Sequence, residues 1–216
     1  MSNEQNPKTG SSEPAVAPST RVDPILEYLN VPDVDVDKNA IRDLFDKLWD
    51  YENGNELTPE DQYLTTVAVF MYTTHNILDD YNVRQDRARE YIVSALDQWI
   101  SPQMDEMVAQ ERASDNPFKA FVDNNVPRVD EIYSWKNFLL EHKTNDDTQW
   151  KYKMKKCWFA EFFIRLGRTD LIQTACQFDQ IPWEKRKDFV DLKLENLFAK
   201  LGKLCQFSYK PAKKDS

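Results

Sequence analysis

Three cysteines and one aspartate in the last third of the chain have the side chains and spacing for nucleophilic or proton-transfer chemistry. They are Cys157, Cys176, Asp179 and Cys205. A thiolate can attack an electrophilic carbon while a carboxylate moves the proton. Cys157 follows Lys155 and Lys156 and precedes an apolar run, and a helix N-terminus with nearby cations favours a thiolate. We therefore expect Cys157 to be the nucleophile, while a buried structural thiol stays open as the alternative.

The other two thiols fit the same site. Cys176 and Asp179 are three residues apart, so a helix would place them on one face. Such a carboxylate could activate water or hold a metal, but an aspartate after a helix is also an ordinary cap or turn residue. Cys205 alternates with Phe207 and Tyr209, which puts all three on one face of a strand. Without a CxxC pair the zinc signal is weak, so the sequence requires no cofactor and leaves a divalent metal open.

Two lysines and a histidine are the candidate substrate-binding residues. Lys153 and Lys155 lie beside Cys157 in an alternating lysine row, and they could attract a substrate carboxylate. Such a row is more often a solvated strand face or protection of a sheet edge. His75 precedes Asp79 by four residues, so this pair could orient a general base. A buried histidine satisfied by its neighbouring acid is the alternative.

Composition and missing motifs exclude several other functions. The 216 residues carry a formal net charge of -9, which disfavours binding to nucleic acid or to anionic lipid. With four glycines and two histidines, the chain contains no glycine-rich nucleotide loop and no HExxH zinc motif. No secretory signal or membrane-spanning stretch is present, so we expect a cytoplasmic protein with a small-molecule partner. The oligomeric state is not indicated.

The elements that must position these residues are mainly helices, followed by a small sheet. Helices are expected near residues 23–29, 37–51, 58–81, 84–110, 130–141, 158–166 and 169–178. Strands are expected near residues 149–156, 189–198 and 203–209, with the last two forming an antiparallel hairpin. The predicted fold class is α+β, with a mostly helical first two-thirds. We expect disordered tails at 1–21 and 211–216 around one domain at 22–210, helical to 148 and cysteine-containing from 149.

The C-terminal third resembles the L-2-amino-thiazoline-4-carboxylic acid hydrolase family. The resemblance rests on four short motifs in order: Lys156-Cys157, Glu161-Phe162 with Leu166-Gly167, Cys176-x-x-Asp179, and Gly202-x-x-Cys205-x-Phe207. Singly they are poor motifs, and together they cover about a quarter of the chain. The segment Gly202-Lys203-Leu204-Cys205 departs from the acidic or polar residues expected between that glycine and cysteine, which puts the family's substrate in doubt for this chain.

The resemblance implies a hydrolase that opens a small ring containing a C=N bond, in amino-acid or specialised metabolism. It also implies that Cys157, Cys176, Asp179 and Cys205 line one site, with a carboxylated substrate held nearby. An enzyme of this kind is one hypothesis. The other is a non-catalytic protein that binds small molecules or a protein partner, in which the cysteines are buried structural thiols and the aromatic-rich core lines an apolar pocket.

Overall fold

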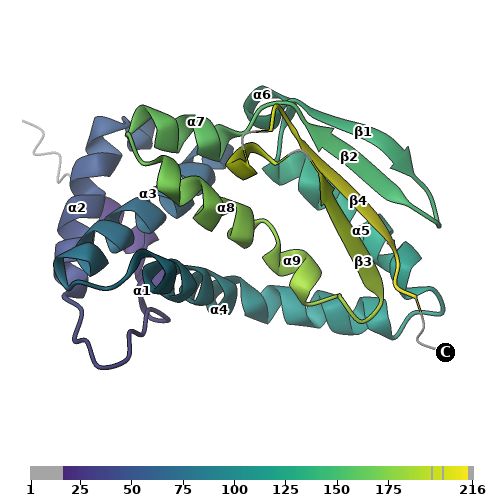
Figure 1. Ribbon diagram of the computed structural model, residues 1–216, viewed down its shortest axis with the longest axis horizontal. Coiled ribbons are helices and arrows are strands. Elements are labelled where there is room, and N and C mark those ends of the chain that lie inside the picture. Colours follow the sequence, from purple (N-terminus) through teal and green to yellow (C-terminus); the bar gives the residue numbers. More distant parts are fainter. Residues whose placement is uncertain (1–16, 196, 201, 214–216) are drawn as a thin grey trace, which may run out of the picture.

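The computed structural model describes residues 17–213 except 196 and 201, and its fold is α+β as predicted (Figure 1). The longer helices are α2 (Lys38–Tyr51), α3 (Pro59–Asp80), α4 (Gln85–Arg112), α5 (Pro117–Ile132), α7 (Trp158–Arg165) and α8 (Ile172–Phe178). The short helices are α1 (Asp23–Leu26), α6 (Trp135–Phe138) and α9 (Ile181–Glu184). The strands are β1 (Leu140–Asn145), β2 (Trp150–Met154), β3 (Val190–Glu195) and β4 (Cys205–Pro211).

The strands form an antiparallel sheet in the order β1-β2-β4-β3. The alternation predicted for β2 is confirmed, because Trp150, Tyr152 and Met154 are all buried. Across the β2–β4 pair, Tyr152 lies opposite Phe207 and Met154 lies opposite Cys205. The inner face of the sheet therefore carries a row of stacked aromatic rings that ends at Cys205.

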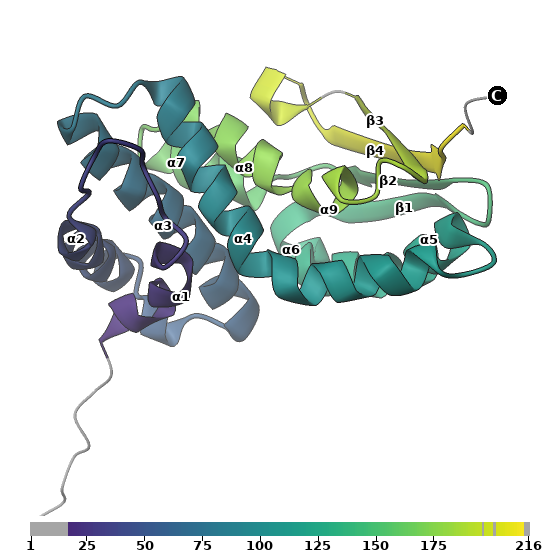
Figure 2. The ribbon, with the colours of Figure 1, turned by 90° about the horizontal axis from the view of Figure 1, so that it is seen from below.

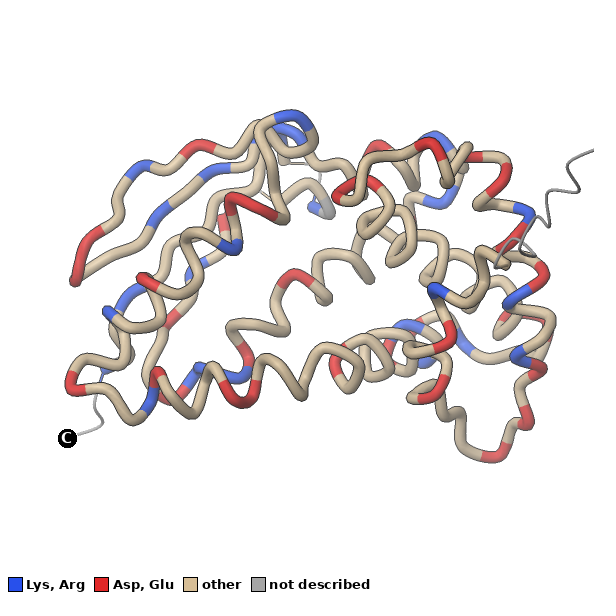
Figure 3. Tube along the Cα trace, turned by 180° about the vertical axis from the view of Figure 1, so that it is seen from behind, with Lys and Arg blue, Asp and Glu red and all other residues tan. Residues whose placement is uncertain are grey.

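Helix α5 covers this inner face (Figure 2). The ring of Phe121 on α5 lies 5.5 Å from that of Trp150 and 5.3 Å from that of Tyr209. The alternate residues of β2, among them Lys151 and Lys153, lie on the opposite face of the sheet. Figure 3 shows basic residues at intervals along the strands. The two faces of β2 thus separate the lysine row from the helix-covered side.

The remaining helices surround α3, in which most residues from Leu64 to Leu78 are buried. Helix starts follow the sequence: the Asp37 carboxylate caps α2, and the Thr58 hydroxyl caps α3 immediately before Pro59. None of the described helices combines the length and apolar character needed to cross a membrane.

The turn after α2 depends on Gly54. A Cβ atom built at this position would lie 2.1 Å from the fully buried indole of Trp49. We expect Gly54→Ala to lower the free energy of unfolding by about 1–3 kcal/mol, because a packed indole has to move. Urea denaturation checks this, with Gly167→Ala as a comparison, since Gly167 has open space around it and a φ of 69°. A loss smaller than about 0.5 kcal/mol for Gly54→Ala would show that the indole moves freely.

One predicted helix is wrong. The pattern over 130–141 predicts a single helix, but α5 ends at Ile132, α6 occupies Trp135–Phe138, and Glu141 lies in β1. Ser134 caps α6, and Leu139 ends it with a φ of 46°. The strand that follows is stabilised by pairing with β2, a non-local contact that local periodicity does not reveal. As a result, the sheet begins inside the part of the chain that was expected to be helical.

The structure describes part of each predicted tail, residues 17–21 and 211–213, and these parts are folded. Pro18–Arg21 form a 3₁₀ helix, and the backbone N–H of Ser19 donates to the Asp46 carboxylate at 2.6 Å. Pro211 belongs to β4, and the N–H of Ala212 donates to the carbonyl of Phe189. The rest of the predicted tails, 1–16 and 214–216, lies outside the described residues.

Candidate active site

The candidate site is centred on the carboxyl of Asp179. It follows the last residue of α8, and the hydroxyl of Tyr133 donates a hydrogen bond of 2.6 Å to its Oδ1. The residue keeps a partly exposed surface, but dense protein surrounds its carboxyl and raises the pKa of Asp179 to about 7. Within the described chain no lysine or arginine pairs with this carboxylate to oppose that shift. A carboxyl with a pKa near neutrality can both accept and donate a proton at physiological pH.

The structure brings the predicted sulfur atoms towards this carboxyl. Asp179 is the second cause, after burial, of the raised pKa of Cys157, and Cys205 and Cys176 contribute to the same shift. Burial and Asp179 also raise the pKa of Cys205 to about 11. Cys157 comes from the start of α7, Cys176 from α8 and Cys205 from β4. The charge of Asp179 therefore reaches Cys157 and Cys205, while the hydrogen bond to the Cys157 sulfur comes from the N–H of Ala160.

Cys157 does not have the electrostatic setting that the sequence predicted. Its Sγ accepts a hydrogen bond of 3.4 Å from the N–H of Ala160 at the first turn of α7, yet burial holds its pKa well above the ordinary value. The ammonium of Lys155 pairs with Glu141 at 2.7 Å, and that of Lys156 pairs with Glu161 at 3.1 Å. The expectation that the thiolate is favoured is wrong, because desolvation outweighs the helix end and both lysines are engaged elsewhere.

Tyrosines form the rest of the site's wall. Burial, with a smaller contribution from the negative charge of Asp179, raises the pKa values of Tyr63, Tyr133, Tyr152 and Tyr209, in the case of Tyr63 to about 12. They come from α3, α5's C-terminal end, β2 and β4. The hydroxyls of Tyr152 and Tyr209 lie 3.4 Å apart on the inner face of the sheet. Phenols that stay protonated can donate to a carboxylate or to charge that develops on a substrate.

Two adjoining cavities lie beside this cluster. The inner one, of about 90 Å³, is lined among others by Tyr133, Phe178 and Pro182. The outer groove, of about 690 Å³, includes Trp99, Gln103 and Glu131. The residues that line both are Tyr63, Ile100, Arg128 and Ile132. Because they share these walls, the two cavities adjoin, and Tyr133 in the wall of the inner one bonds Asp179. Cys157, Cys176, Asp179 and Cys205 themselves are not among the residues that line either cavity.

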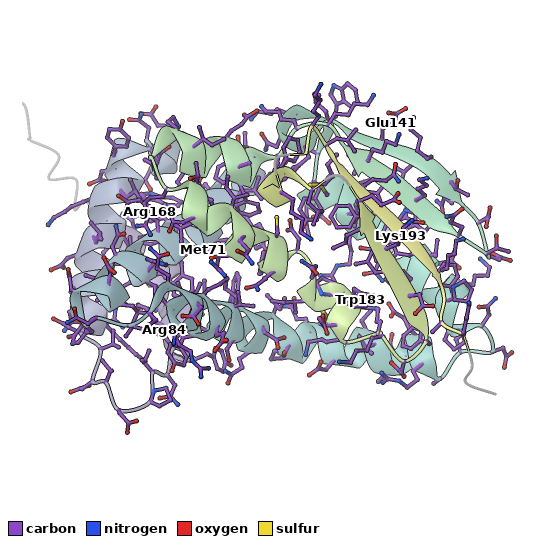
Figure 4. All side chains as sticks on the ribbon, viewed as in Figure 1. Met71, Arg84, Glu141, Arg168, Trp183 and Lys193 are labelled. Carbon is purple, nitrogen blue, oxygen red and sulfur yellow. The ribbon has the colours of Figure 1, made fainter. Side chains whose placement is uncertain are left out.

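The predicted substrate-binding residues lie elsewhere. Lys153 is on the sheet face opposite to Tyr152, and Lys155 is held by Glu141. Nδ1 of His75 accepts a hydrogen bond of 2.8 Å from the guanidinium of Arg168, and burial together with the charge of Arg168 lowers the pKa of His75. Figure 4 places Arg168 in the helical half of the molecule. His75 is twelve residues from Tyr63 on α3, a rise of about 18 Å along the helix, so the structure does not bring it to Asp179.

No group of three or more histidine, cysteine or acidic side chains in the described residues is arranged to hold a metal ion. The sequence reasoning missed Tyr133, Tyr63 and Arg128. Tyr133 and Tyr63 fall in amphipathic patterns that indicate an ordinary core, and no local signal separates a phenol that bonds a carboxylate from one that packs.

Comparison with known families assigns the chain to a family. The sequence model of the L-2-amino-thiazoline-4-carboxylic acid hydrolase family matches residues 66–209, about two thirds of the chain. The match extends well beyond the C-terminal third on which the resemblance was first seen, and it includes most of α3, all of α4 and α5, and the four candidate residues. No curated protein and no solved structure matches significantly. The chain therefore belongs to the L-2-amino-thiazoline-4-carboxylic acid hydrolase family.

Proposed function

We propose that this protein hydrolyses a small carboxylated ring that contains a C=N bond, with Cys157 as the nucleophile and Asp179 as the group that moves the proton. One observation carries the proposal: a carboxyl whose pKa is raised to about 7 interacts with a buried thiol inside the region that matches the family. Membership of a hydrolase family supports the reaction class. The substrate class follows from the family's description, a thiazoline carboxylic acid.

The chemistry can be written with these two groups and water. Asp179 accepts the proton of the Cys157 thiol as the sulfur bonds to the carbon of the C=N group, and the proton then passes to the ring nitrogen. The adduct collapses by breaking the bond from that carbon to a ring heteroatom, which leaves with the proton of the nitrogen as the C=N bond re-forms. Asp179 then takes a proton from water as the oxygen bonds to the same carbon, and passes it to the nitrogen. The bond from the carbon to the Cys157 sulfur breaks, the remaining hydroxyl proton returns to that sulfur, and a C=O group is left in the product. The phenol of Tyr133 keeps the carboxylate oriented throughout.

Activity on the family's substrate is the direct test. We expect the purified chain to convert L-2-amino-thiazoline-4-carboxylate into a ring-opened product that carries a new thiol or amine, detected by mass spectrometry. Heat-inactivated protein and enzyme-free buffer give the background rate. Turnover that does not exceed this background for the thiazoline or for related cyclic C=N carboxylates would remove the hydrolase proposal.

Cys157 is tested separately. Because its pKa lies well above the usual value, we expect iodoacetamide to modify it more slowly near neutral pH than a free thiol, and faster as the pH rises. Cys157→Ala is expected to lower kcat by at least about 100-fold while leaving the melting temperature within a few degrees, since only one sulfur is removed. Val190→Ala, which shortens a fully buried side chain of β3, serves as the control for loss of buried side-chain atoms outside the site. If Cys157→Ala keeps full activity while Asp179 variants are inactive, water attacks the substrate directly.

A non-catalytic binding function is the second candidate. The observation that favours it is the protonated, buried state of both Cys157 and Cys205, which is also the state of structural thiols. In that case the cavities beside Tyr133 would hold a ligand without converting it. Binding of a substrate analogue with no turnover by wild-type protein would support this function over hydrolysis.

A further inference from the structure

We infer that Arg128 is the carboxylate anchor of this site, and that the outer groove admits a small, planar heterocyclic monocarboxylate whose ring enters the inner cavity. This inference deepens the proposed function and rests on it for the identity of the reacting ring. Binding of the ligand carboxylate by Arg128, however, can be measured separately from turnover. The inference assigns substrate recognition to α5 in place of Lys153 on β2 and Lys155 immediately after β2.

The position of Arg128 supports this role. It is a partly buried residue of α5 and is one of the few that line both the outer groove and the inner cavity. A ligand carboxylate bound there would leave its ring one step deeper, next to Tyr133. The hydroxyl of Tyr133 is already bonded to Asp179. The groove, the guanidinium and the phenol thus lie around two adjoining cavities, and the phenol connects them to the carboxyl of Asp179 through its hydrogen bond.

The guanidinium of Arg128 also lacks an anionic partner in the described part of the chain. Its one side-chain hydrogen bond there is a contact of 3.4 Å from Nη1 to the sulfur of Met107, a weak acceptor. Arg165 and Arg186, by contrast, are held by Glu52 and Glu111. Arginine offers a planar fork that matches the two oxygens of a carboxylate. A partly buried arginine without an anion is therefore ready to take one from a ligand.

The walls of the groove select the shape of that ligand. The rings of Tyr63 and Trp99 are stacked with centroids 6.2 Å apart, and both line the outer groove. They present flat apolar surface next to the cation, which suits a planar ring. Glu60 and Glu131 also line the groove, so a second anionic group would be repelled. These features favour one carboxylate on a flat, otherwise neutral or cationic heterocycle over a dicarboxylate.

Binding of 2-aminothiazole-4-carboxylate, the aromatic analogue of the thiazoline, tests the inference without turnover. We expect isothermal titration to show binding to wild-type protein, and Arg128→Gln to weaken it by about 10- to 100-fold, the value of a charge-assisted hydrogen bond. Arg128→Lys should fall between the two, because lysine keeps the charge but not the fork. Arg87→Gln, on an exposed arginine paired with Glu90, should bind as wild type does.

A second experiment changes the ligand and uses the same proteins. The carboxamide of the same thiazole should bind wild-type protein about 10- to 100-fold more weakly than the acid, and Arg128→Gln should lose this preference.

In turnover assays, Arg128→Gln should raise KM and change kcat by less than about threefold, whereas a loss confined to kcat would contradict an anchoring role. The inference is overturned if wild-type protein does not bind the acid, or if Arg128→Gln binds it equally well. Binding with the expected dependence on Arg128 but no turnover would uphold the anchor and reject hydrolysis.

Discussion

Asp179→Asn is expected to lower kcat by about 100- to 10,000-fold, the range that general acid–base catalysis contributes. The amide keeps the size of the side chain and can still accept the hydrogen bond from Tyr133, but it cannot take up a proton. The matched control is Asp115→Asn, which makes the same chemical change in an exposed turn. A turnover rate within threefold of wild type would exclude Asp179 from the proton transfers.

The pH dependence gives an independent measurement. Asp179 acts as a base in its ionised form, and its pKa is raised to about 7. In the wild-type protein, kcat/KM is therefore expected to rise with pH and to level off above about pH 7. If the rise has its midpoint near pH 4, the usual value for aspartate, the carboxyl is not perturbed in the working enzyme.

The same substitution is expected to stabilise the fold at alkaline pH. The pKa of this carboxyl is about 7 in the folded protein and about 3.9 when unfolded, so the folded state binds more protons between these values and stability falls as pH rises through this window. The shift of about three units corresponds to at most about 4 kcal/mol, less any solvent screening of this partly exposed residue. Asp179→Asn removes this penalty. Its melting temperature should exceed that of wild type at pH 8, and the difference should shrink towards pH 4.

Arg186→Met is expected to cause the largest loss of stability, about 3–5 kcal/mol, because it leaves the charge of Glu111 buried without a cation, with only the amides of Asn124 and Asn125 donating to it. Both side chains are fully buried, and Nε of Arg186 lies 2.5 Å from Oε2 of Glu111. Arg186 also donates to the carbonyl of Pro182 at 2.6 Å, and its guanidinium lies 5.4 Å from the ring of Phe121. Pro182 lines the inner cavity, so this ion pair fixes the cavity wall to α4 and α5.

Thermal and urea unfolding would measure the effect. The control is Arg112→Met, which breaks an exposed pair of 2.8 Å with Asp188 and should change stability by less than about 1 kcal/mol. The double variant Glu111→Leu with Arg186→Met should recover most of the loss, since no buried charge remains. Equal losses for Arg186→Met and Arg112→Met would show that the buried pair contributes no more than the exposed one.

Local patterns were sufficient for most of the elements. The aspartate and threonine caps fixed the starts of α2 and α3, and Gly167, with its positive φ, ended α7 as predicted. The alternating sequence of β2 predicts this strand because one of its faces is buried and the other is not. Strand β1 was missed because its residues are polar on both faces and it exists only through pairing with β2.

The sequence by itself determined which thiols and which carboxylate were candidates, and their order agreed with the family. Tertiary structure decided their ionisation. The helix end and the lysines beside Cys157 predicted a thiolate, but burial favours the neutral thiol and gives Asp179 its pKa of about 7. The tertiary structure also decided where a carboxylate can bind, because it pairs Lys155 with Glu141 and places Arg128 between two cavities. The physical reason is that desolvation and ion pairing depend on neighbours brought together from distant parts of the chain, and residue spacing along the sequence does not contain that information.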